Sequence, residues 1–371
     1  MLRKIILFLT VATLGFYATT SSAQIFDIEI TDYDGMDTIP ALKNYIDTQI
    51  QDLENNINKD FPSGTPDRLM EGMANSSVMA GKGIGTDYAS NMDVFLIGAG
   101  VGVGADLAKP SGTDSKLSGV GIAPGLVVGL NLGFIDSTSL LGMDPKHLNI
   151  YFNFMSYNYK KTFESSGKQS EAGLDTLAFG SHVRYNWIRP RGNRLLGWGG
   201  VKVNFGFEYN KTEVTFKTQL DETITQSGSG GETMSGSIQG SPEASILAST
   251  TSFPLALSTD VQILYFVSLY TGAGVDYNMG QAKGHGNLNA NPSTLTCNGG
   301  ACTGLGSGGG NPQVGVQAKA NLDTSGKVNP FLYRAFAGVQ LNLPWTRIFV
   351  QVDKSLSNEL IGATAGLRFA F

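Results

Sequence analysis

The chain ends with the stretch Leu360-Ile361-Gly362-Ala363-Thr364-Ala365-Gly366-Leu367-Arg368-Phe369-Ala370-Phe371. Apolar side chains stand at every second position from Ile361 to Phe371, and the positions between them are small or polar except for Ala370. Such alternation is typical of a β-strand with one apolar and one polar face. One face can lie in lipid while the other faces a polar lumen, and a final aromatic residue suits the membrane interface. The stretch therefore predicts the closing strand of a transmembrane β-barrel.

This terminal strand resembles the C-terminal β-signal of Gram-negative outer-membrane β-barrel proteins, with Leu367, Phe369 and Phe371 in the positions of the signal. The resemblance to outer-membrane barrels covers about residues 93–371. It implies a location in the cell outer membrane, contact with membrane lipids, and recognition by the outer-membrane assembly machinery.

The other end of the chain has the three parts of a secretory signal peptide. Arg3 and Lys4 precede an apolar run of about 14 residues, which is too short to span a bilayer comfortably, and Ser21-Ser22-Ala23 offers a small-residue cleavage site. We expect residues 1–23 to be removed, and no later stretch is long and apolar enough to predict a spanning helix.

Composition also favours a barrel over a soluble enzyme. Charged residues make up 15% of the chain, against roughly 25% in soluble domains. Removal of the signal peptide takes away two positive charges and moves the net charge from −5 to −7. This balance excludes a basic nucleic-acid surface, so no nucleic-acid partner is expected.

From residue 93 onward the alternation predicts an antiparallel barrel of ten strands. The predicted strands are Asp93–Leu107, Gly119–Phe134, His147–Tyr159, Leu174–Ile188, Gly200–Lys217, Thr251–Ile263, Tyr265–Met279, Phe331–Leu343, Thr346–Asp353 and Leu360–Phe371. Long polar loops follow most of the odd strands and short turns follow the even ones, which favours outward odd strands and a periplasmic N-terminus. Segments Ser235–Leu247 and Gln313–Asn321 alternate weakly and leave a barrel of 12 strands as the alternative.

Residues 24–92 differ from the barrel and predict a periplasmic helical extension. Apolar residues recur at helical spacing over residues 39–57, which could associate with a second copy of the chain or pack on the barrel mouth. After a Pro-rich break, a second helix is expected from Asp67 to about Ala80. Residues 67–91 lead directly into a strand whose polar face is the glycine stripe Gly98-x-Gly100-x-Gly102-x-Gly104, so we expect them to form a lumen plug.

Inward-facing charges are the main candidate site. By alternation the lumen lining includes Asp106, Arg184, Lys202, Glu208, Asp260, Asp276, Arg334, Arg347, Asp353 and Arg368. The first interpretation is a salt-bridged interior that satisfies itself, because buried charges need partners. The second is the selectivity lining of a pore.

Enzymatic chemistry is not expected. Ten-strand outer-membrane barrels include the omptin proteases, which carry paired aspartates and an Asp–His pair near the outer rim. His285 is in a suitable loop, but the sequence next to it contains no acid. We therefore predict no catalytic residue, no cofactor and no metal site.

Cys297 and Cys302 are the two cysteines of the chain and lie in a Gly-rich segment. Secretion exposes them to an oxidising compartment, so an extracellular disulfide is expected.

Two functions remain open. One is an outer-membrane channel or transport protein for small solutes, gated by the N-terminal plug. The other is a structural or surface-interaction barrel with an occluded lumen and long extracellular loops.

Overall fold

The computed structural model of this protein describes residues 28–32, 66–89, 94–108, 116–135, 139, 143–165, 168–192, 195–218, 220–227, 233–291, 293–298 and 313–371. The expected signal peptide, the expected helix over residues 39–57 and Cys302 lie outside these residues. Within the described part of the chain, no helix has the length and hydropathy needed to span a membrane.

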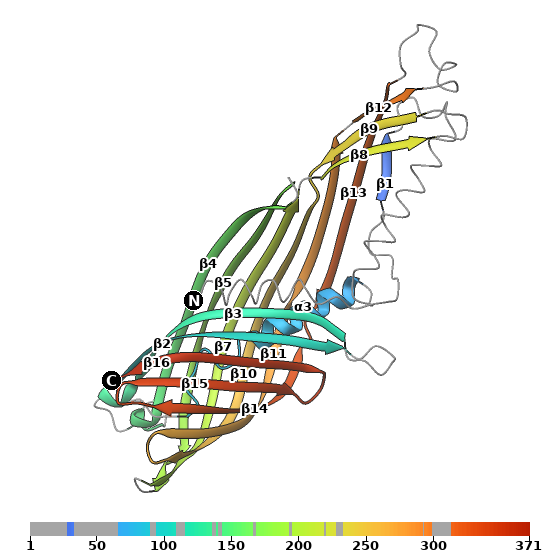
Figure 1. The fold of residues 1–371 in the computed structure, drawn as a ribbon. Coiled ribbons are helices and arrows are strands. Elements are labelled where there is room, and N and C mark those ends of the chain that lie inside the picture. The colour runs from blue at the N-terminus through green and yellow to red at the C-terminus, as the bar shows by residue number, and fades with distance from the viewer. Residues whose placement is uncertain are drawn as a thin grey trace.

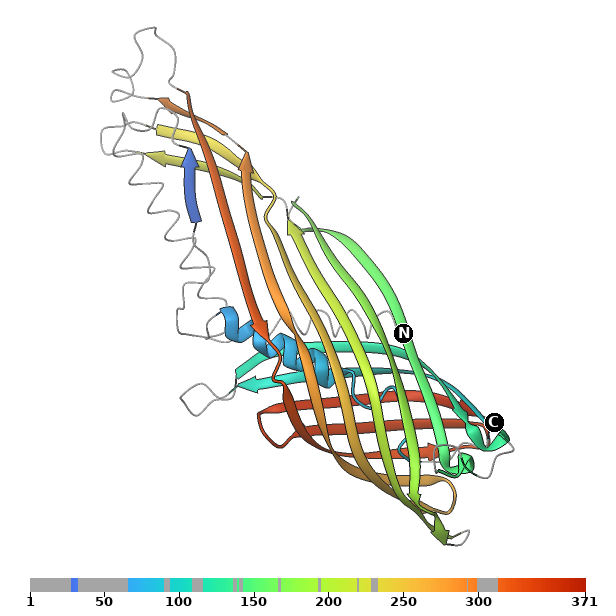
Figure 2. The ribbon, with the colours of Figure 1, turned by 180° about the vertical axis from the view of Figure 1, so that it is seen from behind.

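Ten antiparallel strands form a closed ring (Figures 1 and 2). In order around the ring they are β2 (Phe95–Ala108), β3 (Lys116–Asn131), β4 (Leu148–Ser165), β5 (Lys168–Ile188), β7 (Leu196–Thr218), β10 (Glu243–Ile263), β11 (Val267–Asn291), β14 (Phe331–Asn342), β15 (Thr346–Ser355) and β16 (Leu360–Ala370). The terminal strand closes the ring, because β16 pairs with β2 from Leu360↔Asp106 to Ala370↔Leu96. The prediction of ten strands is confirmed, and the alternative of 12 is wrong.

The alternative fails because neither extra segment adds a strand to the ring. In the first segment, residues 235–240 lie in β9 (Thr233–Gly240), outside the ring, and residues 243–247 are the first residues of β10. Strand β13 (Gln313–Lys327) pairs with the distal part of β11, and the chain then continues into β14, which pairs with the proximal part.

The two ends of the barrel differ. At the short-turn rim, the connections between paired strands include residues 189–195, 264–266 and 343–345, and two 3₁₀ turns (Leu132–Phe134 and Pro145–His147) join β3 to β4. The opposite end is the long-loop rim. Long loops mark the extracellular side of outer-membrane barrels.

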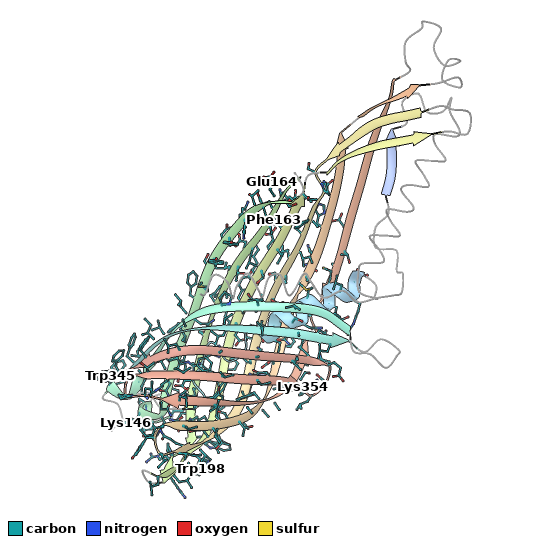
Figure 3. The ribbon with its side chains drawn as sticks, viewed as in Figure 1. Lys146, Phe163, Glu164, Trp198, Trp345 and Lys354 are labelled. Carbon is teal, nitrogen blue, oxygen red and sulfur yellow. The ribbon has the colours of Figure 1, made fainter. Side chains whose placement is uncertain are left out.

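Alternation gives the wall an apolar outer face. Side chains such as Leu126, Phe152 and Leu255 are about half exposed outward, while inward neighbours are buried. Figure 3 shows Trp198 and Trp345 at the short-turn rim, where interfacial aromatic residues belong. A closed barrel leaves no backbone group unpaired toward lipid. These features are those of a transmembrane β-barrel.

The wall has uneven height. Strands β7, β10 and β11 have 23, 21 and 25 residues, whereas β14, β15 and β16 have 12, 10 and 11. A membrane crossing needs about 9–11 residues, so the long strands rise far beyond the short ones. We call the distal parts of β4, β5, β7, β10 and β11, together with β13, the raised sheet.

Four short strands lie around the raised sheet and one lies at the short-turn rim. Strands β8 (Leu220–Ser227), β9 (Thr233–Gly240) and β12 (Ser293–Asn298) add to the raised sheet, and β1 (Ile28–Asp32) pairs with β13. Strand β6 (Arg191–Gly192) pairs with β7 at the short-turn rim.

Helix α3 (Pro66–Ala80) lies inside the ring, between the short strands and the long ones in both views (Figures 1 and 2). Pro66 and Asp67 suit the first turn of a helix, and Gly81-Lys82-Gly83 ends it, with Gly83 at φ 81°. We call residues 66–89 the plug.

Within the expected extension over residues 24–92, the described residues 66–89 run through the lumen, where a plug over residues 67–91 was expected. The helix begins at the long-loop rim, where the Thr324 hydroxyl of β13 donates to Asp67 Oδ1 at 2.8 Å.

Candidate functional site

The lumen and its plug form the candidate site, and wall glycines determine how closely the two approach. A Cβ atom placed on Gly102 would overlap the carbonyl oxygen of Ala80, and one on Gly104 would overlap that of Ser76. On β3, a Cβ on Gly121 would also meet Ser76. Gly102 and Gly104 of the glycine stripe, together with Gly121 on β3, are therefore the surface on which the plug backbone rests.

The opposite side of α3 is apolar. Met70, Ala74, Val78 and Met79 pack in one buried cluster against wall residues of other strands. The wall members of this cluster are Ala248, Ala282, Val328, Leu332 and Leu360. Burial of these side chains stabilises the helix in the lumen, since each removes apolar surface from water.

Below the helix, Lys82 links the plug to three strands, β7, β10 and β11. Its Nζ lies 2.6 Å from Glu208 Oε2 on β7 and 3.4 Å from Asp276 Oδ2 on β11, and it donates to Ser252 Oγ at 2.8 Å. The Lys82 side chain is fully buried. A buried ammonium is tolerated only with partners of this kind.

Asp276 extends the contact into a chain of wall charges. Arg334 Nε lies 2.9 Å from Asp276 Oδ2, and Arg334 Nη1 lies 2.8 Å from Asp353 Oδ1. All three side chains are buried. The plug lysine is thus one member of a connected buried network.

Asp87 forms a second link nearer the short-turn rim. Its carboxylate lies 3.1 Å from Arg347 Nη1 and 3.6 Å from Arg368 Nη1. Arg184 Nη1 donates to the Asp87 carbonyl oxygen, and Arg368 Nη2 donates to the carbonyl oxygens of Gly83 and Thr86 at 3.1 and 2.6 Å. Three arginines from three strands therefore hold this part of the plug.

Tyr88 ends the plug in an aromatic contact. Its ring lies 4.5 Å from the Phe336 ring. Lys202 Nζ donates to the Tyr88 carbonyl oxygen at 2.9 Å and pairs with Asp260 Oδ1 at 2.6 Å. The end of the plug is thus held by an aromatic contact and by a hydrogen bond from a paired lysine.

The structure brings most of the predicted lumen residues to the plug. Six of them contact it directly: Arg184, Lys202, Glu208, Asp276, Arg347 and Arg368. Arg334, Asp353 and Asp260 pair with members of that set. Asp106 is buried in β2 near Arg68.

Sequence reasoning missed Tyr88, whereas the alternation already put His182 in register with the inward-facing charges. His182 Nε2 lies 3.4 Å from Glu208 Oε1, and the alternation of β5 places this histidine on the lumen face. Nothing in the sequence marks Tyr88, because its role depends on which strand the plug reaches.

Other predicted residues lie away from the plug. Leu367, Phe369 and Phe371 face outward and are 38%, 39% and 59% exposed. Cys302 lies outside the described residues and only the backbone of Cys297 is described, so their disulfide stays a prediction.

His285 does have an acidic neighbour in space. Its Nδ1 lies 2.8 Å from Asp323 Oδ1, because β11 and β13 pair these two residues directly. The sequence next to His285 could not reveal an acid that comes from another strand. The pair is exposed on the raised sheet.

A family model described as Lsa36-like matches residues 22–371. No curated protein matches the chain by sequence.

Solved structures with similar arrangements are outer-membrane barrels of differing roles. The transport unit of the autotransporter AIDA-I from Escherichia coli shares 10% identity, with 80% of this chain and 96% of that chain covered and a TM-score of 0.30. The translocator domain of the autotransporter NalP from Neisseria meningitidis shares 10%, covering 76% and 91%, with a TM-score of 0.31. The Pseudomonas putida toluene transporter TodX shares 8%, covering 81% and 99%, with a TM-score of 0.25. Because these identities and TM-scores are low, the barrel architecture is established by the strand pairings of this chain and not by the comparisons.

Proposed function

Because the chain belongs to the Lsa36-like family, whose model spans its barrel and its plug together, we propose one function for the two parts. The protein is a surface-interaction barrel: the lumen is kept closed by the plug, and the working surface is the raised sheet on the extracellular side.

The observation that carries the proposal is the uneven height of the wall. Strand β11 has 25 residues and β15 has 10, so β11 is longer by about 50 Å along its own axis, at about 3.3 Å per residue. A barrel that serves only as a membrane pore has no need of strands this long. The projecting backbone instead builds a broad platform outside the lipid.

Charged pairs on the outer face of the raised sheet support its location in water. Lys217 Nζ lies 2.9 Å from Glu243 Oε1, and Lys160 Nζ lies 4.0 Å from Glu171 Oε1, with side chains well exposed. Charged side chains on the lipid face of a barrel are destabilising. These pairs therefore favour a polar surface above the membrane, able to meet a partner.

The buried contacts of the plug argue against a permanently open pore. Lys82 and Asp87 are each held by oppositely charged wall residues, and removing one partner of a buried pair costs about 3–5 kcal/mol. The closed state is consequently the stable one.

Planar-bilayer conductance tests the proposal. Wild-type protein should insert without steady conductance, whereas a variant lacking residues 67–85 should conduct, since the ring pairs without the plug. The conducting deletion shows that silent wild-type protein was inserted. Steady conductance of the wild type would overturn the surface-interaction function.

A gated channel for small solutes is the second candidate. It is favoured by the polar character of the lower plug, where arginine hydrogen bonds to carbonyl oxygens can be exchanged for water. Brief, repeated openings of wild-type protein, absent from empty bilayers, would support this candidate instead.

A further inference from the structure

The plug runs through the lumen from one rim to the other. Its direction indicates on which side of the barrel the preceding residues lie. At its start, Thr324 of β13 donates to Asp67 Oδ1, and the backbone N–H of Asn329 donates to Asn75 Oδ1 at 2.8 Å. Both partners lie where β13 leads into β14, toward the long-loop rim. At its end, Asp87 pairs with Arg347, two residues from the turn at the short-turn rim. The chain therefore enters the lumen from the long-loop side.

The described residues before the plug lie on the same side. Strand β1 pairs with β13 in the register Ile28↔Ala320 and Glu29↔Lys319. These β13 residues are farther from the short-turn rim than Thr324, because β13 runs from the distal end of the raised sheet toward β14 (Figures 1 and 2). Two segments that flank residues 33–65 thus share the long-loop side.

We propose that this barrel exports its own N-terminal segment: residues 24–65 cross the outer membrane through the lumen, and the plug is the part of the segment that remains inside. The inference rests on the proposed orientation, with the raised sheet outside the cell. A chain delivered to the periplasm must then move its N-terminal segment to the opposite side of the bilayer.

The polar lumen is the physically accessible route. The segment carries many charged residues, including Asp27, Glu29 and Asp32, and charged groups are expensive to move through hydrocarbon. The inner wall provides alternating polar side chains and a glycine surface, against which a helix about 10 Å wide already fits. A segment of the same chain is therefore a suitable cargo for this lumen.

After export the lumen closes without the help of another protein. Once residues 24–65 are outside, residues 66–89 reach the glycine surface, the arginines and the glutamate that hold them. The same contacts stop further movement and reseal the barrel.

Epitope insertion in intact cells tests the topology. A tag after Asp32 reports the N-terminal segment, a tag after Leu356 reports the long-loop rim, and a tag after Arg189 reports the short-turn rim. We expect antibody to label the first two tags equally with and without permeabilisation, and the third only after permeabilisation. Heat-modifiable migration of each variant verifies that the barrel is folded.

The outcomes separate this inference from the proposed function. If the Leu356 tag is labelled on intact cells but the Asp32 tag is not, the N-terminal segment is periplasmic and the export proposal is wrong. If only the Arg189 tag is labelled on intact cells, the orientation is inverted and the proposed function fails as well.

A disulfide trap tests the route through the lumen. Asn210 Nδ2 on β7 lies 3.0 Å from Ser77 Oγ on α3, so Ser77→Cys with Asn210→Cys should cross-link on oxidation when Cys297 and Cys302 are replaced by serine. Ser77→Cys with Tyr209→Cys is the matched control, because adjacent strand residues face opposite sides. A surface-labelled N-terminal tag without the Ser77–Asn210 cross-link would overturn the lumen route.

Discussion

Gly104 illustrates how single wall residues determine whether the lumen can be filled. Its missing side chain leaves space for the carbonyl oxygen of Ser76 and for the backbone N–H of Ala80. The neighbouring Gly100 faces no plug residue among its nearest atoms. Glycines on the same face of β2 therefore differ in whether the plug packs against them.

Gly104→Val should displace the plug while the ring stays paired. Lys82 is fully buried in the native lumen, so trypsin should cleave at Lys82 in folded Gly104→Val protein much faster than in wild type. Gly100→Ala is the control and should resist cleavage, since the nearest atoms to its Cβ belong to the wall residues Ala365, Gly366 and Phe349 and none belongs to the plug. Equal resistance of both variants would contradict the seating of the plug on Gly104.

Lys82→Met should weaken the closed state. The change leaves Glu208 and Asp276 without their shared cation, at a cost of about 3–5 kcal/mol to plug docking. The expected result is frequent channel opening in planar bilayers. Lys354→Met is the control, because the half-exposed pair of Lys354 with Glu359 is worth less than about 1 kcal/mol. A Lys82→Met protein as silent as the control would count against the ion pair.

At the scale of elements, β16 has two roles, one for each of its two faces. Its inward Thr364 and Arg368 donate hydrogen bonds to plug carbonyl oxygens, while Leu367 and Phe369 face outward. Its last residue is held by the backbone, where Phe371 N–H donates to the Phe95 carbonyl oxygen at 2.9 Å. The strand thus closes the ring and contributes to closure of the lumen.

Phe371→Ser should slow barrel assembly more than it destabilises the folded protein. The side chain is 59% exposed, so its loss removes few contacts from the folded barrel, and the backbone bonds to Phe95 remain. Membrane levels of heat-modifiable protein should fall. Phe266→Ser is a matched control, being a 60% exposed phenylalanine in a turn at the same rim. Equal levels of both variants would show that Phe371 is not part of an assembly signal.

For the whole molecule, strands β8 and β9 are separable from the ring. Strand β8 pairs with β9, and β9 also pairs with β12 and with the distal end of β11; none of these pairings closes the ring. Thr218 N–H donates to the Pro242 carbonyl oxygen at 3.1 Å. The chain therefore leaves and re-enters the barrel wall at adjacent points.

Replacing residues 219–241 by a two-residue Asn-Gly turn should leave the barrel folded. Such turns suit antiparallel neighbours like β7 and β10, and heat-modifiable migration should be unchanged. Deleting β16, which is shorter than the replaced segment, should abolish that migration because the ring opens. A misfolded turn variant would show that β8 and β9 are needed to form the ring.

Much of the barrel was predictable because lipid imposes a period of two. The strand ends at the short-turn rim and the inward position of residues such as Arg184 and Arg334 follow from that alternation. At the long-loop rim the strands run farther than expected, as β11 does in reaching Asn291. Above the lipid both faces of a strand meet water, and the apolar alternation disappears although the backbone pairing continues.

The path of the plug could not be obtained in this way. The sequence marked residues 67–91 as a filler for the glycine stripe, and it marked the inward-facing wall charges as groups in need of partners. Which strands supply Glu208 and Arg368, and from which rim the chain enters, depends on contacts between residues more than 100 positions apart. Local periodicity contains no information about such contacts, because they arise only when the closed ring brings its strands around the plug.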